Sequence, residues 1–184
     1  MSLTTKAKSV LVLGGARSGK SSYAEQLVLS SGLSAFYVAT GQAFDEEMRT
    51  RIEAHKSQRA GQGWMTLEEP LGLPLCLAKN AKEGRVLLVD CLTLWLSNLM
   101  HSERNIDEES DKLIQIISSS ACPLIFVSNE VGLSIVPENA LARRFRDEAG
   151  RLNQKVAEAC DTVVFVAAGQ ALQLKPNNSP EIRL

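Results

Sequence analysis

Eight consecutive residues near the amino terminus combine glycines, a lysine and a serine in a spacing suited to binding phosphate. They are Gly14, Gly15, Ala16, Arg17, Ser18, Gly19, Lys20 and Ser21. The glycines allow the backbone to turn so that successive N–H groups point inward at a polyphosphate. Lys20 would neutralise the β- and γ-phosphates, the Ser21 hydroxyl would ligate Mg²⁺, and Arg17 is a candidate second phosphate contact.

The neighbouring residues supply the strand and the helix that such a loop needs. Residues 9–13 are mostly apolar and predict a buried strand ending at Gly14, and residues 20–31 follow a helical pattern. The positive end of that helix's dipole would add to the attraction for phosphate. A short pattern can match by chance, but a strand before it and a helix after it are the context that the mechanism demands. The sequence therefore predicts a P-loop that binds a nucleoside triphosphate with Mg²⁺.

A carboxylate at the tip of another strand is the expected partner of this loop. Residues 86–90 form the clearest strand pattern in the sequence, and Asp90 stands at its end. In P-loop proteins an acidic residue in this place holds Mg²⁺ directly or through water. The alternative is that Asp90 caps a helix or shapes a turn. The central character of the strand favours the metal role.

A basic segment with a histidine follows the second predicted strand. Arg51, His55, Lys56 and Arg59 are three and four positions apart, so they share one face of the helix predicted over residues 44–59. Fixed positive charges suit a phosphorylated ligand and favour a neutral imidazole whose ring nitrogen is free to act as a nucleophile. The alternative is a solvated amphipathic helix whose cations pair with neighbouring glutamates. On spacing alone the solvated helix is favoured.

Length, composition and charge are those of one globular domain. The chain has 184 residues, of which 45% are hydrophobic and 22% charged, and its net charge is −1. Interspersed charges argue against a nucleic-acid partner. No apolar stretch is long enough to span a membrane and the amino terminus lacks a signal pattern, so we expect a cytoplasmic protein without membrane insertion. We treat residues 1–184 as a single domain with a loosely ordered tail from about residue 176.

The cysteines and the second histidine are assigned structural or surface roles. His101 stands in a polar stretch without a partner pattern and is expected at the surface. The cysteines are scattered without a Cys-x-x-Cys pair, which predicts small buried hydrophobes rather than metal ligands or disulfides. They are Cys76, Cys91, Cys122 and Cys160.

Strand and helix patterns alternate along the chain. The strands are apolar throughout, without the alternation of half-exposed strands, as in a parallel sheet covered on both faces. The sequence therefore predicts an α/β fold of the P-loop NTPase type, with a mainly parallel sheet and helices on both faces. Strands are expected at residues 9–13, 35–39, 86–90, 123–127 and 162–167, and helices at residues 20–31, 44–59, 71–80, 92–100, 107–119 and 139–159.

Motifs outside the P-loop occur together in one enzyme family. In chain order they are Asp45 to Met48, Arg51-Ile52 with His55, Trp64…Thr66…Glu68, Ser128 to Gly132, Val136 to Asn139, Arg143 to Asp147 and Gly150 to Gln154. With the P-loop they resemble the bifunctional adenosylcobinamide kinase/adenosylcobinamide-phosphate guanylyltransferase family of cobalamin biosynthesis. The resemblance extends over residues 9–169, and the joint occurrence of these motifs is far more specific than the P-loop alone.

The resemblance implies that one protein catalyses two reactions. Members phosphorylate the hydroxyl on the aminopropanol arm of adenosylcobinamide with a nucleoside triphosphate, ATP or GTP. They then transfer GMP from GTP to adenosylcobinamide phosphate, which gives adenosylcobinamide-GDP and pyrophosphate. This second reaction passes through a GMP-histidine intermediate, and the matching residue here is His55, which with Lys20 would be catalytic.

The resemblance also implies a fold, an assembly and a set of ligand contacts. Members have a RecA-like P-loop fold and assemble as homotrimers. The metal ligands of this chain stay those that the loop and strand patterns predict, Ser21 and Asp90. The nucleotide contacts match Gly14 to Ser21, Thr40, Gly41, Gln42, Lys56, Ser57, Gln58, Arg59, Glu68 and Asp90.

For two groups of residues in the second half of the chain, the sequence is compatible with more than one role. Asn129 and Glu130 follow a predicted strand at the carboxyl edge of the sheet, where ligands bind in open α/β folds. They either bind the corrinoid or position its hydroxyl, or they shape a turn. Arg143, Arg144 and Arg146 would meet a phosphate or a partner subunit, with solvated surface the expected role of at least one.

Two other functions are compatible with the P-loop. The first is a small-molecule kinase without guanylyltransferase activity, in which His55 only contacts the substrate. The second is a non-enzymatic nucleotide switch or assembly ATPase, which would hydrolyse slowly and transfer no phosphate. Covalent labelling by α-labelled GTP separates the first from the bifunctional enzyme, and a direct assay for adenosylcobinamide phosphate separates the second.

Overall fold

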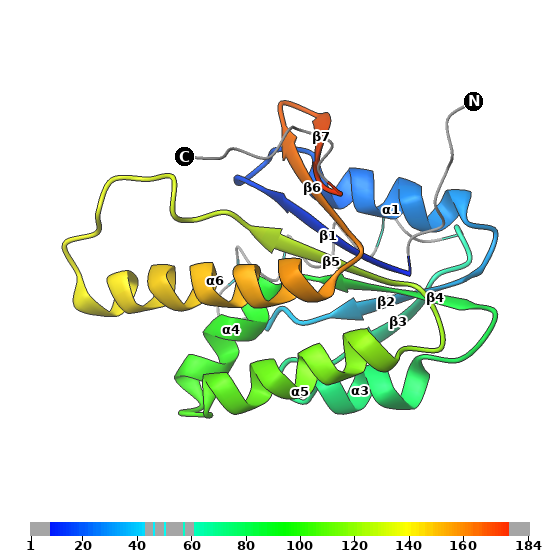
Figure 1. Cartoon of the computed structure of the whole chain (residues 1–184), viewed down its shortest axis with the longest axis horizontal. Helices are drawn as coiled ribbons and strands as arrows, with labels where there is room; N and C mark the ends of the chain where they lie inside the picture. Colours follow the sequence, from blue (N-terminus) through cyan, green and yellow to red (C-terminus); the bar gives the residue numbers. More distant parts are fainter. Residues whose placement is uncertain (1–7, 43–45, 47–49, 51–56, 58–60, 177–184) are drawn as a thin grey trace, which may run out of the picture.

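A seven-stranded sheet forms the centre of the molecule in the computed structural model, which describes residues 8–42, 46, 50, 57 and 61–176 (Figure 1). The strand order is β3-β2-β4-β5-β1-β6-β7, with every pair parallel except β6 and β7. The order reverses at β1, so the carboxyl end of β1 is the switch point at which open α/β sheets bind ligands. The strands are β1 Ser9–Gly14, β2 Ser34–Ala39, β3 Met65–Glu68, β4 Arg85–Asp90, β5 Leu124–Asn129, β6 Thr162–Ala167 and β7 Gln170–Lys175.

Helices cover both faces of the sheet, as Figure 1 shows, with α1 on one face and α3 to α6 on the other. Pro74 lies in the first turn of α3, where its missing N–H costs nothing. Asn105 and Asn139 cap α5 and α6 by accepting hydrogen bonds from free backbone N–H groups. The helices are α1 Lys20–Ser30, α3 Leu73–Asn80, α4 Leu92–His101, α5 Ile106–Ser119 and α6 Ala140–Ala159.

Alternate residues of the strands face two separate cores. Leu87 and Val89 of β4 pack with the helices on one face, around the fully buried Trp95. Val86 and Leu88 of the same strand pack with α1 on the other face. Because both faces are buried, the central strands carry apolar residues at every position, which confirms the predicted three-layer α/β fold.

The predicted elements are confirmed among the described residues, but two strands were missed. β3 and β7 are edge strands, and their residues are mostly exposed, so neither carries the continuous apolar run that marks the central strands. β5 also extends two residues beyond its predicted end, so Asn129 is part of the strand rather than part of the segment after it. Of the helix predicted over residues 44–59, positions 46, 50 and 57 are described and are helical.

The cysteines and His101 have the predicted surroundings. Cys91, Cys122 and Cys160 are buried, Cys76 is half-buried, and all four thiols are free. His101 is exposed, although it is the last residue of α4 rather than part of a turn. Within the described ranges, no helix combines the length and the apolar character needed to cross a membrane.

Candidate functional site

The loop from Gly14 to Lys20 turns sharply at the carboxyl end of β1. Arg17 and Gly19 have positive φ angles of 55° and 96°, which turn the chain before α1 begins at Lys20. Lys20 is 8% exposed, and its Nζ donates a hydrogen bond to the Gly15 carbonyl at 3.1 Å. The helix N-terminus and the lysine ammonium therefore both lie at this loop, as the sequence predicted for a phosphate site.

The turn between β6 and β7 contacts the P-loop directly. The Gly169 N–H donates a hydrogen bond to the Ser18 carbonyl at 2.8 Å. A Cβ on Gly19 would lie 3.1 Å from the Gly169 Cα, and a Cβ on Gly14 would lie 2.4 Å from the Val166 carbonyl oxygen. Two glycines of the motif are therefore required by packing against this turn and against β6, independently of any ligand.

Hydroxyl groups are available at two positions of the loop. The Ser18 Oγ is buried, and no described residue forms a hydrogen bond with it. Ser21 is half-buried in the first turn of α1. Ser21 supplies the kind of oxygen that Mg²⁺ prefers.

Asp90 ends β4, two strand positions from β1. Neighbouring strands are about 4.8 Å apart, so β4 and β1 are about 10 Å apart, with β5 between them. That separation leaves room for a phosphate and a hydrated cation between Asp90 and the P-loop. The Tyr37 hydroxyl donates a hydrogen bond to the Asp90 Oδ2 at 3.1 Å, and the Trp64 ring packs edge-on against Tyr37 at 6.0 Å. Tyr37 and Trp64 therefore orient the carboxylate, a role that no local sequence pattern indicated.

Thr40 joins the ends of β2 and β4. Its Oγ1 donates to the Cys91 carbonyl at 2.7 Å and accepts from the Cys91 N–H at 2.9 Å, and its carbonyl accepts from the Asn98 side chain at 2.7 Å. Thr40 is fully buried, so its side chain fixes the base of the site rather than pointing into it. Burial, with a smaller effect from the neighbouring Asp90, raises the pKa of the Cys91 thiol to about 11.

The other predicted nucleotide contacts lie progressively further along the same edge of the sheet. Gly41 and Gln42 follow β2, and both are half-buried. Glu68 ends β3 and is exposed, four strand positions from β1, which corresponds to about 19 Å. The structure therefore brings Asp90 close to the P-loop but not Glu68.

Several predicted residues cannot be placed. His55, Lys56, Gln58 and Arg59 lie outside the described residues. Ser57 is described, as an exposed helical residue. The proposed nucleophile and its basic neighbours therefore stay predictions.

Glu130 and three arginines of α6, for which the sequence allowed more than one role, differ in their contacts. The Glu130 carboxylate accepts a hydrogen bond from the Gly132 N–H at 2.6 Å, so Glu130 shapes the turn. Arg143 donates to the Pro137 carbonyl at 2.9 Å, and Arg146 pairs with Asp147 at 3.1 Å, whereas Arg144 is exposed.

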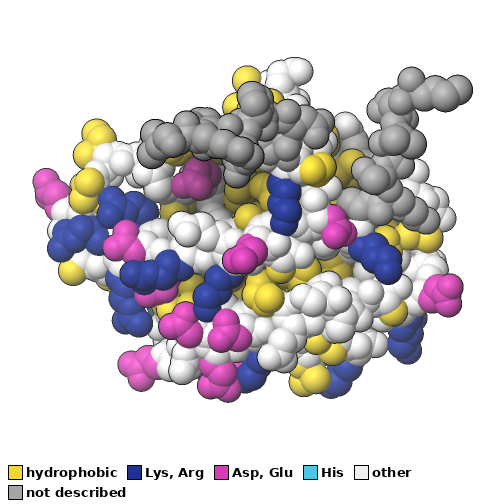
Figure 2. Space-filling view, viewed as in Figure 1, with side chains coloured by type: hydrophobic (Ala, Val, Ile, Leu, Met, Phe, Trp, Pro, Cys, Tyr) yellow, Lys and Arg dark blue, Asp and Glu magenta, His cyan; other side chains and the backbone are white. Residues whose placement is uncertain are grey.

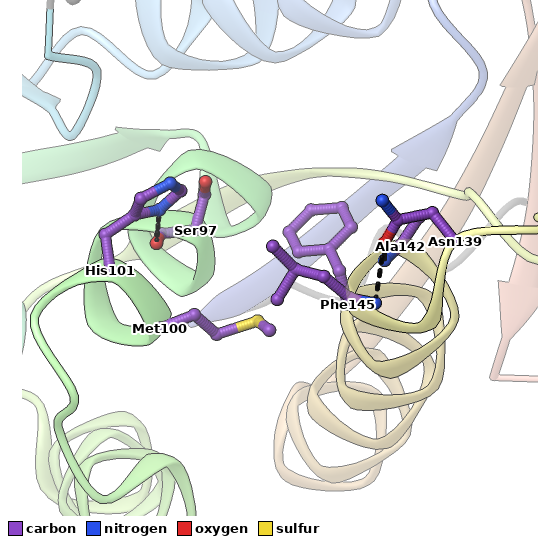
Figure 3. A pocket seen from close by; sticks show the side chains of 7 residues that line it. Ser97, Met100, His101, Asn139, Ala142 and Phe145 are labelled. Atoms are coloured by element: carbon purple, nitrogen blue, oxygen red, sulfur yellow. Dashed lines mark hydrogen bonds between the residues drawn. The ribbon is translucent and has the colours of Figure 1, made fainter.

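A cleft of about 380 Å³ opens between the end of α4 and the start of α6 (Figure 3). Met100 extends from α4 toward α6, which contributes Phe145, and His101 bonds the Ser97 carbonyl at 2.7 Å. The loop before α6 carries the exposed apolar residues Leu133, Ile135 and Val136. In Figure 2 hydrophobic side chains are visible on this loop at the left, beside the mixed charges of α6.

The loop at the switch point, the acidic end of β4 and the parallel sheet define a P-loop NTPase of the RecA-like type. Solved structures agree with this fold at low identity. The flagellar accessory protein FlaH of Methanocaldococcus jannaschii is 17% identical at a TM-score of 0.53, covering 92% of this chain and 79% of its own. The RadB recombinase is 16% identical at 0.51, covering 85% and 73%.

Sequence comparisons narrow this class to one family. The family described as cobinamide kinase / cobinamide phosphate guanyltransferase matches residues 10–174. The bifunctional adenosylcobalamin biosynthesis protein CobP of Pseudomonas aeruginosa is 49% identical, over 90% of this chain and 96% of its own. CobU of Salmonella typhimurium is 38% identical, over 90% and 99%. The chain belongs to the cobinamide kinase / cobinamide phosphate guanyltransferase family, and it is a bifunctional enzyme of that family.

Proposed function

We propose that the chain performs both reactions of its family at the carboxyl edge of the sheet, with adenosylcobinamide and its phosphate as substrates. The observation that carries the proposal is the arrangement of Lys20, Ser21 and Asp90 around the end of β1. The first reaction transfers the γ-phosphoryl group of ATP or GTP to the substrate hydroxyl. The second transfers GMP from GTP to the resulting phosphate and releases pyrophosphate.

The P-loop serves both reactions in this proposal. Lys20 neutralises the β- and γ-phosphates, and the N–H groups of the loop hold their oxygens. Ser21 and Asp90 hold Mg²⁺ through a hydroxyl and a carboxylate, which are hard oxygen donors. When bound, Mg²⁺ neutralises the charge that develops on the phosphoryl group in transfer. The same grip on the β- and γ-phosphates stabilises the pyrophosphate that leaves in the second reaction.

His55 is the nucleophile of the second reaction in this proposal. Its ring nitrogen forms a bond to the α-phosphorus of GTP, the α,β-bridging bond breaks, and pyrophosphate leaves with the electron pair. The phosphate of adenosylcobinamide phosphate then attacks the same phosphorus and releases the histidine. The neighbouring cations Lys56 and Arg59 would neutralise the phosphates during this step.

The nucleotide is proposed to lie along the carboxyl edge, from the P-loop toward β3. The phosphates are held at residues 14–21, and the sugar and base extend past Asp90 toward Gly41, Gln42 and Glu68. A nucleoside triphosphate is long enough to bridge most of this distance. Ser57 and Gln58 would approach the same nucleotide from the segment that carries His55.

The assembly and the location of the protein complete the proposal. The exposed apolar side chains of the loop before α6 support association of subunits, which we propose to be a homotrimer, because burial between subunits would remove these side chains from water. Four free thiols, three of them buried, are compatible with the reducing cytoplasm.

The decisive experiment uses purified protein, adenosylcobinamide, and ATP or GTP with Mg²⁺. The wild type should form adenosylcobinamide phosphate and then adenosylcobinamide-GDP, and α-labelled GTP should give an acid-labile, alkali-stable label on the protein. Lys20→Ala should lower both reactions by at least about 10²-fold, since it removes a charge that stabilises both transition states. His55→Ala should abolish the label and keep the kinase reaction.

Exposed Lys82→Ala is the matched control and should leave both reactions unchanged, because Lys82 precedes β4 at the opposite edge of the sheet. Formation of adenosylcobinamide phosphate without any covalent label in the wild type would reduce the function to that of a kinase. Nucleotide hydrolysis without transfer to adenosylcobinamide would exclude both activities.

A further inference from the structure

Four residues from three elements form a closed ring of hydrogen bonds behind the carboxyl edge of the sheet. The Asn129 N–H donates to the Thr93 Oγ1 at 2.8 Å, and the Thr93 and Ser128 hydroxyls are 3.3 Å apart. The Ser128 Oγ donates to the Asn153 Oδ1 at 2.7 Å, and the Asn153 Nδ2 donates to the Asn129 carbonyl at 3.3 Å. Thr93 lies on α4, Ser128 and Asn129 end β5, and Asn153 lies on α6.

The ring runs in a single direction. The Ser128 hydroxyl uses its one hydrogen toward Asn153, so Thr93 must be the donor in the contact between the two hydroxyls. The exposed fractions of Thr93, Ser128 and Asn153 are 7%, 2% and 6%. A buried polar network with all its members satisfied is rigid, because loss of any partner leaves a desolvated group without a hydrogen bond. The ring therefore holds the backbone of Asn129 in one position.

The side chain of Asn129 is also oriented by the ring. Its Nδ2 donates to the Thr93 Oγ1 at 3.2 Å, which turns the amide nitrogen toward α4 and leaves Oδ1 on the other side of the amide group. Among the residues that the structure describes, none donates a hydrogen bond to this oxygen. Asn129 thus presents an acceptor with a fixed orientation that no residue in the described part of the chain uses.

Asn129 lies at a strand end between the two parts of the phosphate site. Asn129 is the register partner of Gly14, and the next residue, Glu130, donates its N–H to the Gly14 carbonyl at 3.1 Å. On its other side β5 pairs with β4, which ends at Asp90. The P-loop and Asp90 therefore flank the strand end that carries Asn129.

We propose that Asn129 is a substrate-contacting residue of the kinase step, whose Oδ1 accepts a hydrogen bond from the alcohol being phosphorylated, and that Thr93, Ser128 and Asn153 are its positioning residues. This inference rests on the proposed function. The alcohol oxygen forms a bond to the γ-phosphorus, the bond from that phosphorus to the β,γ-bridging oxygen breaks, and the nucleoside diphosphate leaves with the electron pair. A carboxamide takes up no proton, so the alcohol proton passes to an oxygen of the transferred phosphoryl group. Asn129 orients the alcohol for in-line attack.

The proposal separates the two reactions of the enzyme. Formation of the enzyme–GMP intermediate needs GTP and the protein nucleophile but no substrate alcohol. After phosphorylation the alcohol oxygen is esterified and has no hydrogen to donate. A change at Asn129 should therefore slow the kinase step and leave the covalent labelling by α-labelled GTP in place.

The test compares kinase kinetics, covalent GMP labelling and melting temperature in two pairs of variants. Asn129→Ala should lower the kcat of adenosylcobinamide phosphorylation by about 10²-fold, the size expected when an orienting contact is lost. The KM for ATP and the yield of covalent label should stay within about threefold of wild type, because neither depends on the alcohol. Asn129→Asp keeps an acceptor oxygen and the shape, so its kinase kcat should stay well above that of Asn129→Ala, whereas a purely structural loss would lower the melting temperature of both variants.

The ring is tested by Thr93→Val and Thr93→Ser. The valine has the same shape without the hydroxyl and should lower the kinase kcat by about tenfold, whereas the serine keeps the hydroxyl and should restore most of it. Asn80→Ala is the matched control, because this half-buried asparagine also bonds a backbone carbonyl, that of Cys76 at 2.8 Å, but lies on α3 away from the site.

Three results would overturn the inference. They are wild-type kinase kcat in Asn129→Ala, equal kinetics of Thr93→Val and Thr93→Ser, and a loss of covalent label parallel to the loss of kinase activity. The last result would make Asn129 a nucleotide or structural residue. Failure of the wild type itself to phosphorylate adenosylcobinamide would instead contradict the proposed function.

Discussion

Residues at the base of the site are held in place by hydrogen bonds between the ends of neighbouring strands. Thr40 bonds both the carbonyl and the N–H of Cys91, and Asp90 accepts from Tyr37. These contacts place the end of β4 relative to the end of β2. Only a few groups need to face the ligand, because the residues behind them are already fixed in position.

The thiol of Cys91 gives a prediction about pH. Its folded-state pKa is raised from 9.0 to about 11, mainly by burial. The neutral thiol is therefore favoured in the folded state, and its contribution to stability is complete below pH 9 and is lost as the pH rises from 9 toward 11. In Cys91→Ala the free energy of unfolding should fall less between about pH 8 and about pH 10.5 than in wild type.

Urea unfolding at the two pH values measures this difference. Lysines and tyrosines titrate in the same range, so only the comparison with the variant isolates the thiol. An equal fall in both proteins would contradict the assignment, as would rapid alkylation of Cys91 in the folded protein at neutral pH.

Among the elements, the antiparallel pair β6–β7 contacts the P-loop directly. Its turn contains Ala168 and Gly169, both with positive φ, and the Gly169 N–H bonds the Ser18 carbonyl at 2.8 Å. β7 extends the sheet at an edge, and through this turn it also supports the phosphate-binding loop. An edge strand that the sequence did not reveal thus contributes to the shape of the site.

The glycines of the loop should therefore differ in their structural importance. Gly14→Ala should lower the free energy of unfolding by about 1–3 kcal/mol, because the new Cβ has no room against β6. Gly15→Ala should change it by no more than about 0.5 kcal/mol, since a Cβ there meets no atom within 4 Å. Chemical denaturation without nucleotide measures both, and equal effects would show that packing does not distinguish them.

At the scale of the whole molecule, exposed apolar side chains gather at the end where the loop before α6 lies (Figure 1). Leu133, Ile135 and Val136 are exposed on the loop before α6, and Leu141 follows on the first turn of the helix. The cleft between α4 and α6 lies beside the end of this loop, because Asn139 and Leu141 line it (Figure 3). Burying such side chains between subunits would remove them from water.

The proposed homotrimer is tested by Ile135→Asp, because this side chain is 94% exposed in the single chain. The charged residue should shift the protein from trimer to monomer in light scattering coupled to size exclusion, with little change in melting temperature of the monomer. Leu75→Asp, at an exposed apolar position on α3, is the matched control and should leave the mass unchanged. A monomeric wild type, or a trimer in Ile135→Asp, would contradict this interface.

The sequence by itself determined the P-loop, the central strands, most of the helices and the family, because these depend on local spacing and on runs of apolar residues. It did not reveal β3 and β7, whose exposed edges carry no such run. Only the tertiary structure decided which groups surround the phosphate site. Tyr37 reaches Asp90 across 53 positions, and Asn129 reaches Thr93 across 36. Such contacts follow from strand order and from the register between strands, which no local pattern records.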